Sequence, residues 1–205
     1  MKVAIILYLI AAMLSTSEAA TGILSDSTAN RHKARGEYAL VVYAGAGFSY
    51  YSTDIGIPDG MQNVNTNRLG FPASVRIMWH PDHKLRLGIE SGWTTMYSYT
   101  SQIAGKDAQV YLSAVPILLV WSMPIAKRFH LFAGTGTYLV NSHLEYEGIV
   151  NVNTLSMGWM AAGSYIQPIN KNLGLAAEVK WMNATETADA NLTLQLQLVW
   201  KFLRW

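Results

Sequence analysis

The 205-residue chain contains no cysteine, and only 14% of its residues are charged. The absence of cysteine excludes disulfide frameworks, thiolate zinc sites and cysteine nucleophiles. A formal net charge of +2 is too small for the basic stripe of a nucleic-acid-binding protein, so no nucleic-acid partner is expected. Intrinsic disorder is excluded as well, because half of the residues are hydrophobic and the chain holds 7 Trp and 11 Tyr.

A long hydrophobic run is also lacking after the first twenty residues. Lys2 precedes an apolar stretch over residues 3–14, and Ser17-Glu18-Ala19 offers the small residues that a signal peptidase recognises. This stretch is too short for a spanning helix, which needs about 20 apolar residues. We therefore predict a cleaved signal peptide over residues 1–19, a flexible polar leader over residues 20–36, and a single domain over residues 37–205.

From residue 37 onward, apolar side chains recur at every second position, which is the period of a β-strand. In the last segment, Leu192, Leu194 and Leu196 alternate with Thr193 and Gln195. Eight such strands are predicted, and their length suits tilted membrane spans. They cover residues 38–50, 68–80, 85–97, 110–121, 129–140, 155–166, 173–181 and 192–202.

The connections between these strands alternate in length. Short turns follow the second, fourth and sixth strands, whereas longer polar loops follow the first and third, over residues 52–67 and 98–109. The remaining two loops, 142–151 and 184–190, are shorter but polar. This alternation is typical of a transmembrane barrel whose termini lie on the short-turn side. The predicted fold is an all-β, eight-stranded, antiparallel up-and-down transmembrane β-barrel.

The charged side chains fall on the face opposite the apolar one, so the barrel is expected to be apolar outside and polar inside. We predict that these residues form a structural charge network in a filled lumen, with Arg86 or Arg76 paired to Glu90 and Glu178 paired to a cation. The predicted network residues are Arg68, Arg76, Arg86, Glu90, Glu178, Lys180 and Lys201.

Aromatic residues near both ends of the strands predict two belts at the lipid–water boundaries. On the short-turn side they are Tyr38, Trp79, Trp121, Phe129, Tyr165 and Trp200, and on the long-loop side Tyr50, Trp93, Tyr97, Tyr111, Tyr138 and Trp181.

Three stretches resemble the small outer membrane β-barrel domain proteins of Gram-negative bacteria, a group with the architecture of OmpA/OmpX-type and OmpW-like barrels. They are residues 115–119 with 127–134 (VPILL and KRFHLFAG), residues 158–165 with 172–178 (GWMAAGSY and NLGLAAE), and the terminal Trp205. The resemblance implies an outer membrane location, contact with outer membrane lipids, and insertion by the barrel-assembly machinery through the C-terminal strand. We expect a monomer.

Two positions depart from that family's pattern. The family often has a carboxylate two residues before the strand proline, where this chain has Ala114, so any ion pair made there must be absent or rearranged. Trp205 falls on the polar side of the last strand's alternation, and a β-bulge or a frayed end near Leu203 would restore its register.

No enzyme, cofactor or metal site is predicted. Ser142 and His143 lie close to Glu145 and Glu147, but their spacing matches no esterase signature. His80 and His83 with Asp82 form an incomplete metal site. The sequence favours a structural or surface-interaction role, and a narrow transport path for small or hydrophobic solutes and a lipid-modifying enzyme remain as alternatives.

Overall fold

The computed structural model describes residues 38–53, 55, 62–81, 85–103, 106–145, 148–185 and 189–204. The predicted signal peptide, the predicted leader and Trp205 lie outside these residues. The strands are β1 (Ala39–Tyr51), β2 (Gln62–Asn67), β3 (Leu69–Gly70), β4 (Ala73–His80), β5 (Arg86–Ile103), β6 (Lys106–Pro124), β7 (Phe129–Glu145), β8 (Ile149–Pro168), β9 (Leu173–Ala184) and β10 (Asp189–Arg204). No helix in the described part of the chain is long and apolar enough to cross a membrane.

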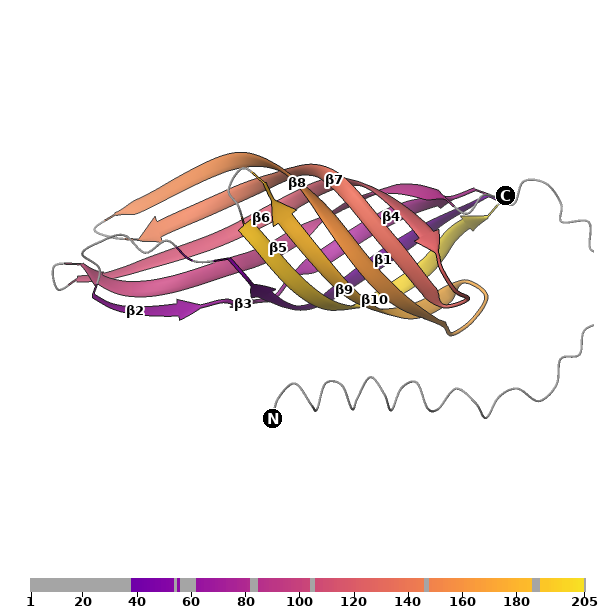
Figure 1. Ribbon diagram of the computed structural model, residues 1–205, viewed down its shortest axis with the longest axis horizontal. Helices are drawn as coiled ribbons and strands as arrows, with labels where there is room; N and C mark the ends of the chain where they lie inside the picture. The colour runs from indigo at the N-terminus through magenta and orange to yellow at the C-terminus, as the bar shows by residue number, and fades with distance from the viewer. Residues whose placement is uncertain are drawn as a thin grey trace, which may run out of the picture. The chain divides into compact units, whose positions relative to one another are not determined.

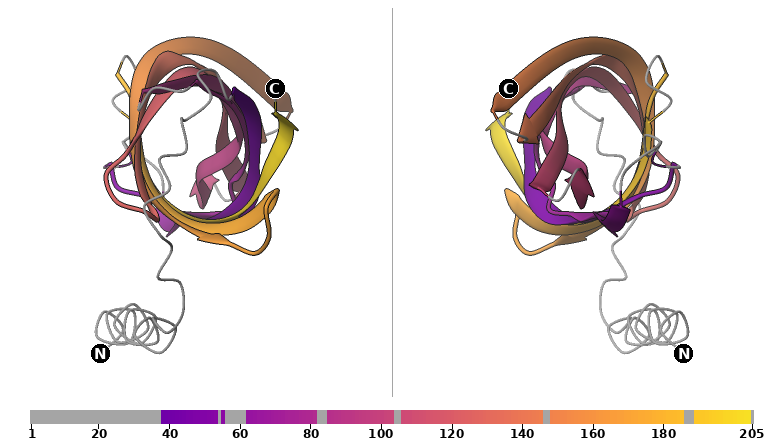
Figure 2. Two further views of the ribbon diagram at one scale, coloured as in Figure 1. Left: turned by 90° about the vertical axis from the view of Figure 1, so that its right-hand side faces the viewer. Right: turned by 90° about the vertical axis from the view of Figure 1, so that its left-hand side faces the viewer.

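Eight of these strands form a closed ring. Neighbours in the sequence pair antiparallel from β4 through β10, β4 also pairs with β1, and β10 pairs back to β1. The ring is visible end-on in Figure 2, and the tilt of the strands is visible from the side in Figure 1. The predicted eight-stranded antiparallel barrel is therefore confirmed. The short strands β2 and β3 lie in the connection between β1 and β4, where they pair with β5 and β1 respectively.

The two faces of the barrel differ as the alternation predicts. In β9, Leu175, Val179 and Trp181 are exposed on the outside, while Glu178 and Lys180 are buried in the lumen. The outer surface is thus a band of apolar side chains, which a membrane would cover. Because strand side chains alternate in direction, the same local sequence supplies both the lipid-facing and the lumen-facing surface.

Two hairpins are longer than the sequence suggested. The pairing of β5 with β6 continues to Ile103 and Lys106, and that of β7 with β8 continues to Glu145 and Ile149. The loops predicted over residues 98–109 and 142–151 are therefore largely strand. Strand propensity depends on the partner strand and on the surroundings, so the polarity of these residues alone did not mark the strand ends. Both hairpins extend toward the left of Figure 1.

A β-bulge in β5 changes the direction of the side chains that follow it. Thr95 and Tyr97 oppose the consecutive residues Ser113 and Leu112 of β6, so Met96 is the extra residue. Tyr97 consequently packs 4.8 Å, between ring centroids, from the lumen-facing Tyr51. The placement of Tyr97 in the outer aromatic belt was therefore wrong, because the bulge reverses the alternation.

Tyr138 was also wrongly placed in the aromatic belt. Its side chain is fully buried in the lumen, and its hydroxyl donates a hydrogen bond of 3.2 Å to the Trp159 carbonyl. The alternation in β7 places Tyr138 with Phe132 and Val140, all of which are buried. Of the other aromatic residues predicted on the outside, Trp79, Trp93, Trp121, Trp181 and Trp200 are exposed there.

A second bulge lies at the C-terminal end of β10. Leu40 pairs with Leu203 and Val41 pairs with Lys201, which leaves Phe202 as the extra residue. Phe202 and Leu203 are both exposed, so the side-chain alternation shifts by one position at this point. Of the two irregularities that the sequence allowed near Leu203, a bulge and a frayed end, the described residues show the bulge.

Candidate functional site

The candidate site is a group of ionisable side chains in the middle of the lumen. Arg76 in β4 and Glu90 in β5 are direct cross-strand neighbours. Both positions fall on the inward face of their strands, and both side chains are 1% exposed. Because β4 and β5 are consecutive strands of one hairpin, the pairing of these two strands alone brings Arg76 and Glu90 into contact.

The other two charges come from a different strand. Glu178 and Lys180 lie two residues apart in β9, so both point into the lumen. Their side chains are 0% and 1% exposed. In the ring order, β9 is separated from β4 by β10 and β1, so only closure of the barrel brings the two pairs together.

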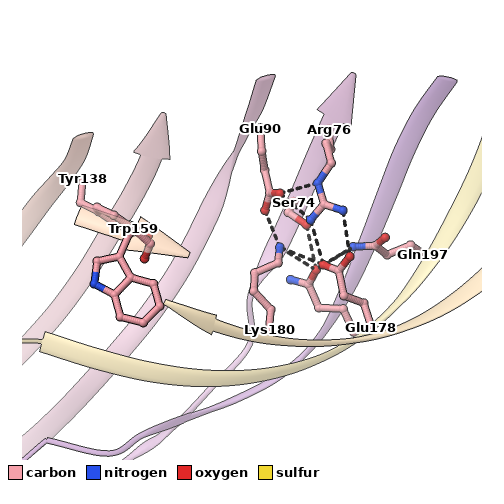
Figure 3. A network of polar contacts seen from close by, with 9 residues as sticks. Ser74, Arg76, Glu90, Tyr138, Trp159, Glu178, Lys180 and Gln197 are labelled. Atoms are coloured by element: carbon pink, nitrogen blue, oxygen red, sulfur yellow. Dashed lines mark hydrogen bonds and ion pairs between the residues drawn. The ribbon is translucent and has the colours of Figure 1, made fainter. Parts of the chain in front are cut away.

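The four side chains form one connected network, drawn in Figure 3. Arg76 Nε donates to Glu90 Oε2 at 2.6 Å, and its two terminal nitrogens donate to Glu178 Oε2 and Oε1 at 2.8 and 2.9 Å. Lys180 Nζ donates to Glu90 Oε1 and lies 3.2 Å from Glu178 Oε1. Each cation thus contacts both carboxylates.

Uncharged polar side chains complete the network. Gln197 Nε2 donates to Glu178 Oε1 at 3.0 Å and to Gln195 Oε1 at 3.2 Å. Gln195 Oε1 also accepts a hydrogen bond from Ser74 Oγ at 2.8 Å. These amides satisfy further hydrogen-bonding groups that would otherwise be buried without a partner.

Two aromatic rings cover the Arg76 guanidinium. Its central carbon lies 4.2 Å from the centroid of the Phe132 ring and 5.7 Å from that of Tyr43. The rings of Tyr43 and Phe132 contact each other edge to face at 5.7 Å. This aromatic layer and the charge network are in contact inside the barrel.

The electrostatics of the network are balanced. Two carboxylates meet one guanidinium and one ammonium, so the network of four charges is formally neutral. Burying isolated charges is very costly, but charge-assisted hydrogen bonds with good geometry offset that cost. The arrangement fixes the relative positions of β4, β5 and β9 and leaves no unpaired charge among these four groups.

The remaining residues of the predicted network lie elsewhere. Arg86 is half-buried near the short-turn end, where its Nη1 donates to His130 Nδ1 at 3.2 Å, and it does not pair with Glu90. It lies four positions from Glu90 along β5, more than 10 Å along the strand, beyond side-chain reach of the network's centre.

Arg68 and Lys201 also lie outside the network. Arg68 is half-buried between β2 and β3, in the connection that follows β1, and its carbonyl accepts a hydrogen bond from the Tyr51 amide. Lys201 is exposed near the end of β10, beside the bulge. For both residues the alternation indicated the inward face, but neither is a member of the network of Arg76, Glu90, Glu178 and Lys180.

Sequence reasoning missed the aromatic and amide members of the site. Gln195 and Gln197 were recognised as lumen-facing but not as partners of the charges, and Tyr43 and Phe132 were not singled out. The only local signal was the alternation itself. Ala114, at the position where the resembled family often has a carboxylate, is fully buried, and the network takes its carboxylates from β5 and β9 instead.

The candidate nucleophile Ser142 does not point toward His143. Ser142 and His143 are adjacent in β7, so their side chains point to opposite faces of the strand. His143 Nδ1 instead contacts Asn151 Oδ1 at 2.5 Å. Glu147, His83 and Asp82 lie outside the described residues. Within the described ranges, no three His, Asp or Glu side chains form a metal-binding group.

Comparisons with known proteins support the fold. No protein-family model matches the chain, and no curated protein matches it. Among solved structures it is similar to Ail, the attachment invasion locus protein of Yersinia pestis, in its complex with the heparin analogue sucrose octasulfate. That similarity has a TM-score of 0.55 and 10% identity over 82% of this chain and 99% of Ail. Neisserial surface protein A gives a TM-score of 0.47 and 15% identity over 80% of this chain and 97% of that protein.

At such low identity the similarity to Ail shows the fold alone. This chain therefore has the fold of the small outer membrane β-barrel proteins of Gram-negative bacteria.

Proposed function

We propose that this chain is a non-enzymatic outer membrane β-barrel of a Gram-negative bacterium, with a closed lumen and a surface-interaction role. The outer membrane location is supported by the apolar outer band and by the predicted signal peptide. In such barrels the termini and short turns face the periplasm, and the longer hairpins face the cell exterior.

The observation that carries the proposal is the filled lumen. The network of Arg76, Glu90, Glu178 and Lys180 is at most 1% exposed and spans from β4 to β9. Eight strands leave an interior that side chains just fill, and here charges and aromatic rings do so. Function is consequently assigned to the surfaces outside the lumen.

The β7–β8 hairpin supplies such a surface. Among the described residues, the strand that pairs with residues 149–157 of β8 is β7, because the pairing of β8 with β9 begins at Gly158. The first seven residues of β8 are all exposed, including Ile149, Val150 and Val152. An open strand edge with apolar side chains favours binding of a partner by addition of a β-strand.

The residues whose main-chain amide and carbonyl groups face the open edge of β8 can be identified. The Met157 carbonyl accepts a hydrogen bond from the Thr185 amide at 2.8 Å, so the main-chain groups of Met157 point away from β7. Because these directions alternate along a strand, Asn153 presents its amide and carbonyl to the same open side. A partner strand would pair with Asn153 and its alternate neighbours.

The charge of the outer connections indicates which partners fit. Residues 52–67, 98–109, 142–151 and 184–190 contain the carboxylates Asp54, Asp59, Asp107, Glu145, Glu147, Glu186 and Asp189, against the single cation Lys106. This acidic character favours a neutral or basic partner. Ail was solved with a sulfated ligand, and the acidic connections of this chain give no support for a ligand of that charge.

Membrane insertion is assigned to the last strand. We propose that the barrel-assembly machinery recognises the C-terminal end of β10, where Phe202 and Leu203 are exposed beside the bulge. Outer membrane lipids cover the apolar band, and the closed ring of strands supports a monomer, because closure leaves no strand edge unpaired along the spanning part.

A planar-bilayer measurement tests the closed lumen. The mature protein, refolded from Ala20 onward and checked by a heat-modifiable gel band, is expected to give no discrete current steps. Regular, salt-dependent steps from the folded protein would contradict the closed lumen and favour a transport path.

An attachment assay tests the surface role. A non-adherent Gram-negative strain that displays the protein is expected to bind to matrix-protein-coated surfaces or cultured cells more than the parent strain. Asn153→Pro, which removes the outward amide, should abolish this gain, while the matched control Asn153→Ala, which keeps it, should not. Equal attachment by both variants would contradict binding through the strand edge.

A further inference from the structure

The short-turn end of the lumen contains a cavity that the charge network does not use. Its volume is about 290 Å³, and Tyr43 and Val41 form part of its inner wall. Tyr43 also covers Arg76, so this aromatic layer separates the cavity from the network. With the termini and short turns facing the periplasm, the cavity opens toward the periplasm.

Five of the polar side chains that line this cavity are basic, and the neutral ones are Tyr43, Asn170 and Asn172. Arg86, Lys127 and Lys201 contribute permanent cations, and His80 and His130 contribute imidazoles. No carboxylate of the described residues lines it. Such a concentration of positive charge in a concave, half-enclosed place attracts anions.

The two histidines add hydrogen-bonding capacity. His80 Nε2 is buried and has no hydrogen-bond partner among the described residues. Arg86 Nη1 donates to His130 Nδ1 at 3.2 Å, which requires Nδ1 to be the unprotonated nitrogen of that ring. His130 therefore carries its proton on Nε2, as a donor. A buried nitrogen without a partner is costly unless a ligand or water satisfies it.

We propose that this cavity is a binding site for a phosphate group. Three cations and two imidazoles from β4, β5, β7, β10 and the β6–β7 turn converge on one space. A monovalent carboxylate would be satisfied by Arg86 alone, whereas a tetrahedral, multiply charged oxyanion accepts hydrogen bonds from several directions. Lysine and arginine together are the usual residues for such a ligand.

The phosphate group has two potential sources at this location. One is a phosphorylated small solute of the periplasm that enters the open end of the barrel. The other is the headgroup of an anionic phospholipid in the adjacent leaflet, since exposed Lys127 lies in the β6–β7 turn at the rim. Both present the same oxyanion chemistry, and a competition experiment distinguishes them.

Calorimetric titration with inorganic pyrophosphate tests the site. The folded protein in phosphate-free maltoside micelles is expected to bind pyrophosphate saturably, and Arg86→Gln should weaken binding by about tenfold or more. Lys201→Gln, a change at an exposed position, should weaken it by a smaller factor. The matched control is Lys171→Gln in the β8–β9 turn, which removes a cation outside the cavity lining and should leave binding unchanged.

Repeating the titration with added phosphatidylglycerol identifies the source. Weaker apparent pyrophosphate binding would support a lipid headgroup as the occupant, and unchanged binding would support a soluble phosphorylated ligand. Absence of saturable binding by the wild-type protein at millimolar pyrophosphate would overturn the proposal. Equal weakening by Arg86→Gln and Lys171→Gln would also overturn it, because that result would indicate only general attraction to a basic rim.

Discussion

Arg76 and Glu178 are 102 positions apart in the sequence, yet two parallel hydrogen bonds of 2.8 and 2.9 Å join them inside the barrel. This paired geometry is the strongest form of contact between a guanidinium and a carboxylate. It links β4 to β9 across strands that lie between them in the ring. Formation of this contact therefore requires the closed barrel.

Removing the charge of Glu178 should destabilise the barrel strongly. In Glu178→Gln, Arg76 and Lys180 share the single carboxylate of Glu90, so one buried positive charge is not balanced. We expect the free energy of unfolding to fall by about 3–5 kcal/mol, measured by urea titration in lipid vesicles. Glu145→Gln, at an exposed position, is the control and should change it by less than about 0.5 kcal/mol.

A double-mutant cycle should show that Arg76 and Glu178 are coupled. The loss in Arg76→Gln/Glu178→Gln should be smaller than the sum of the two single losses by about 0.5–3 kcal/mol, because the second change removes a group that the first left unpaired. Additive losses would mean that the two residues stabilise the barrel independently and would contradict the network.

An arginine on the outer face should lower the free energy of unfolding only where lipid covers the barrel. Val179 is 52% exposed on that face and pairs with Leu194 and Gly163 in the neighbouring strands. Val179→Arg should lower the free energy of unfolding in vesicles by about 2–4 kcal/mol. Thr154→Arg, on the exposed part of β8, should be close to neutral, and similar losses in both variants would contradict the assigned membrane band.

Two glycines of β8 offer a steric test of the lumen packing. A Cβ added at Gly158 would lie 2.2 Å from the backbone carbonyl oxygen of Asn183 in β9 and 2.6 Å from Cε2 of Tyr138, whereas one added at Gly163 would meet nothing within 4 Å. Gly158→Ala should therefore destabilise the barrel by about 1–3 kcal/mol, and Gly163→Ala should not, as judged by urea titration. An unchanged free energy of unfolding in Gly158→Ala would contradict the close packing of β8 against Asn183 and Tyr138.

The inward or outward direction of most side chains could be predicted from the sequence, because in a regular strand it depends only on the position of the residue in the alternation. The alternation placed Glu178 and Lys180 inside and Val179 outside without any knowledge of their neighbours. It failed at Tyr97, since the bulge at Met96 inserts one residue and reverses the direction of those that follow. No residue type at this point of the sequence signals a bulge.

Strand length was harder to predict than strand position. The sequence located the eight spanning segments, but the polar residues of the β5–β6 and β7–β8 hairpins resembled loops. Asn141 and Asn153, for example, pair across the β7–β8 hairpin although both are polar. Such pairing depends on the partner strand and on water at both faces, which composition within one segment does not report.

The sequence by itself determined the alternation, the class of barrel and the inward direction of the charged residues. Tertiary structure decided which of those charges meet. Arg76 joins Glu178 while Arg86 joins His130, because the stagger and closure of the strands set the depth of each side chain along the barrel. The direction of a side chain depends only on its place in the alternation of one strand, whereas its depth along the barrel depends on how all the strands of the ring pair.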